Sequence, residues 1–102
     1  MWGLSEKSIE EIHGILASIP AIEEAVIYGS RARGDYKPAS DIDLTLTGRD
    51  LTLRDVALLD DKLYYSYQPY YFDTSILAEI KNQDLLDNIR RDGQVFYRRQ
   101  KK

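Results

Sequence analysis

The segment from Asp41 to Thr47 alternates polar and apolar residues without interruption. A period of two is typical of a β-strand that buries one of its faces. The apolar face would consist of Ile42, Leu44 and Leu46, and the polar face of Asp41, Asp43, Thr45 and Thr47. A chain with this strand needs further strands beside it and helices over its apolar face.

Helical and extended patterns alternate along the rest of the chain. Apolar residues at helical spacing predict helices over residues 5–19, 52–67 and 84–91, and one or two helical turns fit within residues 29–34. Short apolar or alternating runs predict strands over residues 25–28 and 70–77 and an extended piece over residues 94–97. Ser8 and Glu11 stand in the register of a capping box. This order predicts a small sheet with helices packed on it, and 102 residues suit one domain over residues 1–102.

Composition excludes several classes of site and of protein. Cysteine is absent and His13 is the single histidine, so disulfides and thiolate or zinc sites are excluded and any metal must be held by oxygen. No apolar run approaches the ~20 residues that cross a bilayer, and the N-terminus does not have the pattern of a signal peptide. We therefore expect a cytoplasmic protein that does not enter the membrane.

The charges are unevenly distributed along the chain. The net charge is −3, yet six basic residues lie in the last thirteen positions, namely Arg90, Arg91, Arg98, Arg99, Lys101 and Lys102. We expect this basic tail to be a solvated chain end, with contact to a partner or a phosphate as the alternative. The remaining acidic body is a poor surface for a polyanion unless divalent cations lie on it, so direct nucleic-acid binding is the weakest functional hypothesis.

The unusual feature of the alternating segment is its pair of aspartates, because Asp is depleted from strands. Asp41 and Asp43 would lie about 6.5 Å apart at Cα on one face. Two ionised carboxylates about 4 Å apart repel by about 4 kcal/mol at an effective dielectric of 20. Either the pair faces open water at a strand edge, or a divalent cation such as Mg²⁺ neutralises it.

Gly29 and Ser30 offer a place for the phosphates that Mg²⁺ usually accompanies. A glycine turn between a strand and a helix presents free backbone N–H groups, although such a pair is most often only a turn. The Gly29 to Gly34 spacing is not a P-loop, because Asp35 and Tyr36 stand where Lys and Ser or Thr are required. A Rossmann fingerprint is also absent.

The run Gly29-Ser30-Arg31-Ala32-Arg33-Gly34 followed by Ser40-Asp41-Ile42-Asp43-Leu44 resembles the signature of the DNA polymerase beta-like nucleotidyltransferase superfamily. Within that superfamily the chain is similar to the minimal nucleotidyltransferases, which consist of the catalytic domain alone. Asp73, in the run Tyr71-Phe72-Asp73-Thr74, matches the acidic residue that follows in a later strand. The resemblance spans roughly residues 5 to 97 and implies an α+β (α/β-like) fold with a small mixed sheet.

The resemblance also implies roles for individual residues. Asp41, Asp43 and Asp73 would be catalytic and would hold two Mg²⁺ ions, and Gly29 and Ser30 would hold the β- and γ-phosphates of a nucleoside triphosphate. Arg33 and Ser40 are further candidates for nucleotide binding. For Arg33, on a short exposed helix with Arg31, the alternative is a solvated side chain; for Ser40 it is a turn cap or an aspartate-orienting hydroxyl.

The implied activity is transfer of a nucleoside monophosphate, AMP from ATP, to a hydroxyl. The resemblance also implies that the acceptor is a tyrosine of a HEPN-domain toxin. This chain would then be the antitoxin and would form a hetero-oligomer with that toxin. The alternative is a non-catalytic module that neutralises its partner by complex formation. Five tyrosines between Tyr64 and Tyr71 would form either the edge of a core or a binding surface.

Overall fold

The computed structural model describes residues 1–100. Helices and strands alternate along the chain as the sequence predicts. Their bounds are α1 Glu6–Ala17, β1 Glu24–Tyr28, α2 Ser30–Arg33, β2 Ile42–Thr47, α3 Leu53–Tyr64, β3 Phe72–Ile76, the 3-10 turn η1 Leu77–Glu79, α4 Gln83–Asp92 and β4 Gln94–Arg98. Among the described helices, none is long and apolar enough to cross a membrane.

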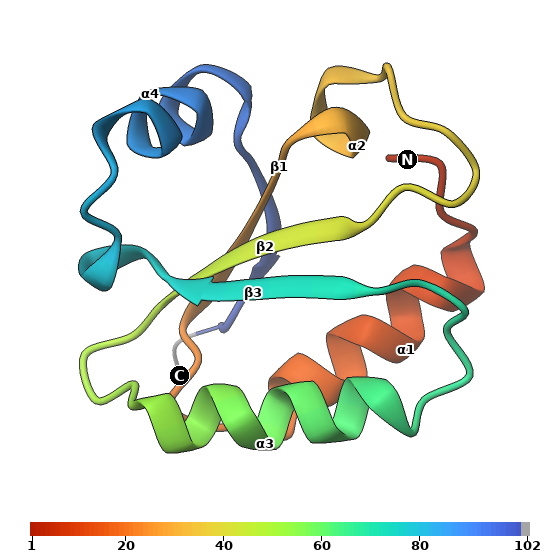
Figure 1. Cartoon of the computed structure of the whole chain (residues 1–102). Helices are drawn as coiled ribbons and strands as arrows, with labels where there is room; N and C mark the ends of the chain where they lie inside the picture. Colours follow the sequence, from red (N-terminus) through yellow and green to blue (C-terminus); the bar gives the residue numbers. More distant parts are fainter. Residues whose placement is uncertain (101–102) are drawn as a thin grey trace.

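The four strands form one mixed sheet in the order β3-β2-β1-β4. The strands β2 and β3 run parallel, and β1 is antiparallel to both β2 and β4. Figure 1 shows α1 and α3 below the sheet and α2 and α4 above it. This arrangement confirms the predicted α+β class with a small mixed sheet, and it leaves β3 as an edge strand beside α3.

The core lies between the sheet and the helices α1 and α3. Ile42, Leu44 and Leu46 are fully buried there, as the alternation predicts. Apolar residues at helical spacing cover them from α1 and α3, and these are Ile12, Leu16, Val56, Leu59 and Leu63. Burial of each such side chain contributes about 1.5–3 kcal/mol, so this face of the sheet holds the domain together.

The helix ends differ from the predicted ones by a few residues. Ser5 caps α1 by accepting a hydrogen bond from the Ser8 backbone N–H, so the predicted Ser8–Glu11 capping box is wrong. The reciprocal box occurs instead at α3, between Thr52 and Asp55. Both helices end two or three residues early, at Ala17 and Tyr64, before the prolines that the sequence offers as stops.

The basic tail is tied to the fold as far as the structure describes it. Arg98 forms an ion pair of 2.8 Å with Glu24, and the Arg99 guanidinium donates to the carbonyls of Ile22, Ala17 and Ile19. The expectation of a solvated chain end is therefore wrong for Arg99, whereas the Arg98 side chain is 67% exposed. Lys101 and Lys102 lie outside the described residues.

Candidate active site

The parallel pairing of β2 and β3 places two of the three predicted aspartates side by side. Asp43 and Asp73 are direct partners in the register, so their Cα atoms face each other across one strand spacing, about 4.8 Å. Asp41 immediately precedes β2 and shares the face of Asp43. All three carboxylates therefore belong to the face opposite the core.

The electrostatics of Asp43 show that its neighbours are close. Burial, followed by the negative charges of Asp73 and Asp41, raises the pKa of its carboxyl to about 6, while Arg33 opposes the shift. Burial, together with the charges of Asp73 and Asp43, raises the pKa of Tyr28 as well. The cluster thus carries an unfavourable concentration of negative charge in the folded chain.

Gly29 is required by the close approach of the backbone to Asp43. Its φ is 77°, a conformation that L side chains rarely adopt. A Cβ atom at this position would lie 2.3 Å from Asp43 Oδ2, well inside any tolerable contact. The turn from β1 into α2, which begins at Ser30, therefore lies directly against the carboxylate cluster.

Arg33 and Ser40 occupy different positions relative to the carboxylates. The Arg33 side chain is 40% exposed and forms ion pairs with Asp35 at 3.3 Å and Asp92 at 3.5 Å, close enough to Asp43 to lower the pKa of that carboxyl. The Ser40 hydroxyl accepts a hydrogen bond of 2.7 Å from the Lys37 backbone N–H. Ser40 is therefore a turn cap here, which was the alternative expectation for its side chain.

Arg31 was expected on an exposed helix, and this expectation is wrong. Its side chain is buried, and its guanidinium donates to the carbonyls of Trp2, Pro38 and Ser40 at 2.9 to 3.2 Å. It also stacks between Tyr36 and Tyr70, with ring centroids at 5.2 and 4.6 Å. Arg31 thereby fixes the loop that carries Ser40 and Asp41 to the site.

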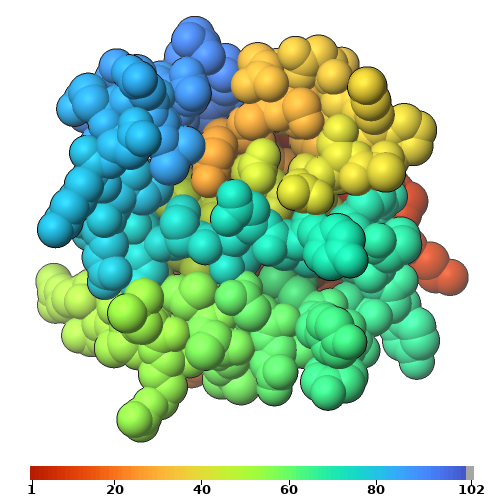
Figure 2. All heavy atoms as spheres, viewed as in Figure 1, coloured from red at the N-terminus to blue at the C-terminus, as the bar shows by residue number. Residues whose placement is uncertain are grey.

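A layer of hydroxyl groups lies beside the carboxylates on the same face of the sheet. Ser75 donates a hydrogen bond of 3.0 Å to Thr45, which is fully buried, and Ser75 also interacts with Tyr28. The strand alternation predicts that Thr45 and Ser75 follow Asp43 and Asp73 on this face. The surface in Figure 2 is hollowed above β3, between α4 and the segment around α2.

The residues present fit a hard divalent cation. The ligand set consists of carboxylate oxygens, which Mg²⁺ prefers, and a cation would relieve the repulsion that raises the pKa of Asp43. Within residues 1–100, no three His, Cys, Asp or Glu side chains are already gathered in a metal-binding arrangement. The carboxylates would have to close further on binding an ion.

Comparisons with known proteins identify a matching family and solved structures of similar fold. The family model described as "Polymerase beta, Nucleotidyltransferase" matches residues 10–102. A solved toxin-antitoxin structure with AMP-PNP shares the fold with a TM-score of 0.71 at 21% identity, covering 90% of this chain and 74% of that one. A mutant of the toxin-antitoxin MntA-HpeT gives 0.68 at 18% identity with the same coverage of 90% and 74%.

No curated protein matches the chain significantly in sequence. The family match nevertheless covers nearly the whole chain, including the turn at Gly29 and the strands that carry Asp41, Asp43 and Asp73. The chain belongs to the polymerase beta nucleotidyltransferase family.

Proposed function

We propose that the chain transfers a nucleoside monophosphate, AMP from ATP, to a protein hydroxyl in a Mg²⁺-dependent reaction. The observation that carries the proposal is the direct pairing of Asp43 with Asp73 on parallel strands, on the face that Asp41 shares, against the turn at Gly29. A carboxylate cluster beside a tight glycine turn suits a metal-bound triphosphate, because such a turn lets the phosphates approach the backbone closely.

Each site residue then has a distinct task. Asp41, Asp43 and Asp73 would hold two Mg²⁺ ions, which when bound neutralise the charge on the attacking and leaving oxygens of an in-line displacement. Asp73, on the edge strand, would accept the proton of the acceptor hydroxyl. Gly29 and Ser30 would bind the β- and γ-phosphates, and Arg33 would add a positive charge at the rim between α2 and α4.

For the acceptor and partner, we propose a tyrosine of a HEPN-domain toxin that this chain neutralises in a hetero-oligomer. The toxin-antitoxin proteins with the same fold support this choice, as does the sequence resemblance to minimal nucleotidyltransferases. Tyr64 and Tyr71 are largely exposed and line one groove between α3 and the start of β3, which suits a protein-binding surface.

The test is transfer of label from ATP to a purified HEPN-domain partner in the presence of Mg²⁺. The wild-type chain should label the partner and release pyrophosphate, and Asp43→Asn should do neither. Asp50→Asn is the matched control, because Asp50 is exposed in the turn after β2, at the end of that strand away from the site. If the partner stays unlabelled with the wild-type chain as it does with Asp43→Asn, the enzymatic proposal is wrong.

The alternative is a binding module that neutralises its partner without chemistry. It predicts that Mg²⁺ leaves the melting temperature unchanged, whereas a metal that binds only the folded chain raises it. The concentration of carboxylates that raises the pKa of Asp43 favours the enzyme, since a module without a metal gains nothing from that repulsion.

A further inference from the structure

Tyr71 stands beside the carboxylate cluster at the start of the edge strand. Its backbone carbonyl accepts a hydrogen bond of 2.9 Å from the Ile42 N–H, so the parallel pairing of β2 and β3 continues to Tyr71. This pairing sets Tyr71 next to Asp41, one step before the Ile42 to Phe72 pair. The side chain of Tyr71 is 83% exposed.

The strand alternation gives Tyr71 the same face as Asp73. Phe72, between them, packs against the core, and Asp73 two residues on belongs to the carboxylate face. Two residues of a strand separate the Cα atoms by about 6.5 Å. A tyrosine side chain is long enough to cross that interval and bring its hydroxyl above the neighbouring carboxylates.

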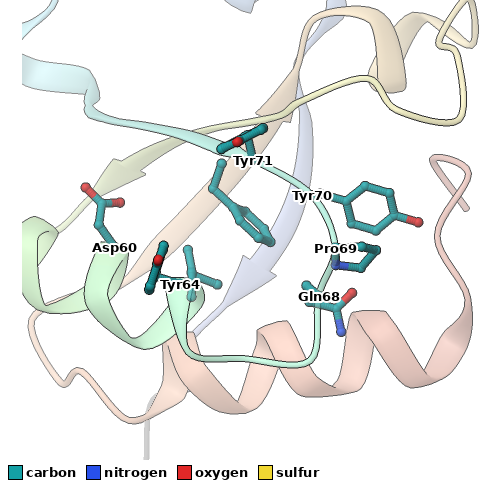
Figure 3. A pocket seen from close by; sticks show the side chains of 8 residues that line it. Asp60, Tyr64, Gln68, Pro69, Tyr70 and Tyr71 are labelled. Atoms are coloured by element: carbon teal, nitrogen blue, oxygen red, sulfur yellow. The ribbon is translucent and has the colours of Figure 1, made fainter.

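The other tyrosines are buried or lie away from the carboxylates. Tyr28 adjoins the carboxylates but is buried, Tyr36 and Tyr70 contact Arg31, and Tyr65 and Tyr67 lie in the loop after α3. Figure 3 shows Tyr71 against the β3 ribbon, with Tyr64 across a groove on the α3 side. The groove has a volume of about 330 Å³ and leaves the Tyr71 side chain open to solvent.

We propose that the chain nucleotidylates its own Tyr71, in cis, when it holds a nucleoside triphosphate and no partner covers the site. This inference rests on the proposed function. The Tyr71 hydroxyl oxygen would form a bond to the α-phosphorus, the bond from that phosphorus to the α–β bridging oxygen would break, and pyrophosphate would leave. The phenolic proton would pass to the Asp73 carboxylate and from there to water.

The geometry favours Tyr71 because it lies on the side from which an acceptor must come. Gly29 and Ser30 lie at the end of β1, on the far side of β2 from β3, so the triphosphate would approach from that side. Tyr71 and Asp73 lie on the opposite side, on the edge strand, where the attacking hydroxyl has to meet the proton acceptor. A modified Tyr71 would then occupy the approach of any external acceptor.

The experiment incubates the purified full chain with ATP and Mg²⁺, without partner, and maps the product by intact and tandem mass spectrometry. We expect one nucleoside monophosphate on Tyr71, with complete loss in Tyr71→Phe and in Asp43→Asn. Tyr67→Phe is the matched control and should retain the modification, because Tyr67 is 95% exposed but lies in the loop before β3. Two results would show that the reaction occurs within one chain. The first-order rate constant of modification should not change on dilution. In a mixture, Tyr71→Phe, which keeps the active site, should not label Tyr71 of Asp43→Asn.

A second readout does not depend on turnover. Tetranitromethane should nitrate Tyr71 in the free chain, and α,β-methylene ATP with Mg²⁺ should suppress nitration at Tyr71 but not at Tyr65 or Tyr67. Label on another residue or on an added partner, with Tyr71 unmodified, would overturn this inference and leave the proposed function standing. Absence of label and pyrophosphate with the partner present would remove both.

Discussion

The two faces of the central sheet are stabilised in opposite ways. Ile42, Leu44 and Leu46 are fully buried against α1 and α3, so every one of them adds to stability. On the other face, Asp43 stands directly beside Asp73, and burial together with the charges of Asp73 and Asp41 raises the pKa of Asp43 to about 6. One strand thus holds the domain together through one face and concentrates unfavourable charge on the other, which indicates that the second face is kept for binding.

The largest expected effect is the loss of transfer in Asp43→Asn. An asparagine cannot neutralise a cation, and because even residues that only support metal ligands cost 10–100-fold, we expect a loss of at least about 100-fold in kcat/KM. Steady-state pyrophosphate release measures it. Asp50→Asn should stay within twofold of wild type, and a comparable loss there would show that the effect is not confined to the carboxylate face.

On the apolar face, Leu44→Ala should have the opposite effect: it should lower stability and leave transfer by the folded chain unchanged. Leu44 is fully buried in the middle of β2, so the substitution leaves a cavity and should cost about 2–5 kcal/mol of unfolding free energy. Urea unfolding measures the loss. Transfer by the fraction that remains folded should be close to wild type, whereas a loss of activity beyond the folded fraction would mean that the two faces are not independent.

Gly29→Ala tests whether the phosphate turn and the carboxylates share one space. The added Cβ would meet Asp43 Oδ2 at 2.3 Å, and the positive φ adds backbone strain, so we expect a cost of about 1–2 kcal/mol in stability and a loss of transfer. Gly34→Ala is the control for strain, because Gly34 also has a positive φ, 93°, but open space around its Cβ position. Equal activity of the two variants would argue against crowding at Asp43.

The sequence predicts the two faces more completely than it predicts the site. Alternation assigns each residue of β2 to a face, and helical spacing identifies the covering helices, because both are local periodicities. The pairing of Asp43 with Asp73 is a matter of register between strands far apart in the chain, and only the family resemblance singled out Asp73 in advance. Arg31 looked exposed because its partners, the carbonyls of Trp2, Pro38 and Ser40, come from two separate segments.

The smallest expected effect is a pH dependence of stability that arises from Asp43 on the carboxylate face. The pKa of Asp43 is raised from its usual value near 4 to about 6, so the folded chain binds this proton more tightly than the unfolded chain does. The stabilising contribution is therefore complete below pH 4 and is lost as the pH rises to about 6. Because the group is about half exposed, solvent screening reduces the change to about 1 kcal/mol.

Urea unfolding of the metal-free chain between pH 4 and 7 measures this slope, and comparison with Asp43→Asn cancels the groups that do not interact with Asp43. We expect wild type to lose stability relative to Asp43→Asn as the pH rises. Saturating Mg²⁺ should reverse the difference, since a cation that binds the ionised carboxylate stabilises only the folded wild type. Identical pH profiles with and without Asp43 would mean that the pKa of Asp43 is the same in the folded and the unfolded chain, so that folding creates no unfavourable charge for a cation to relieve.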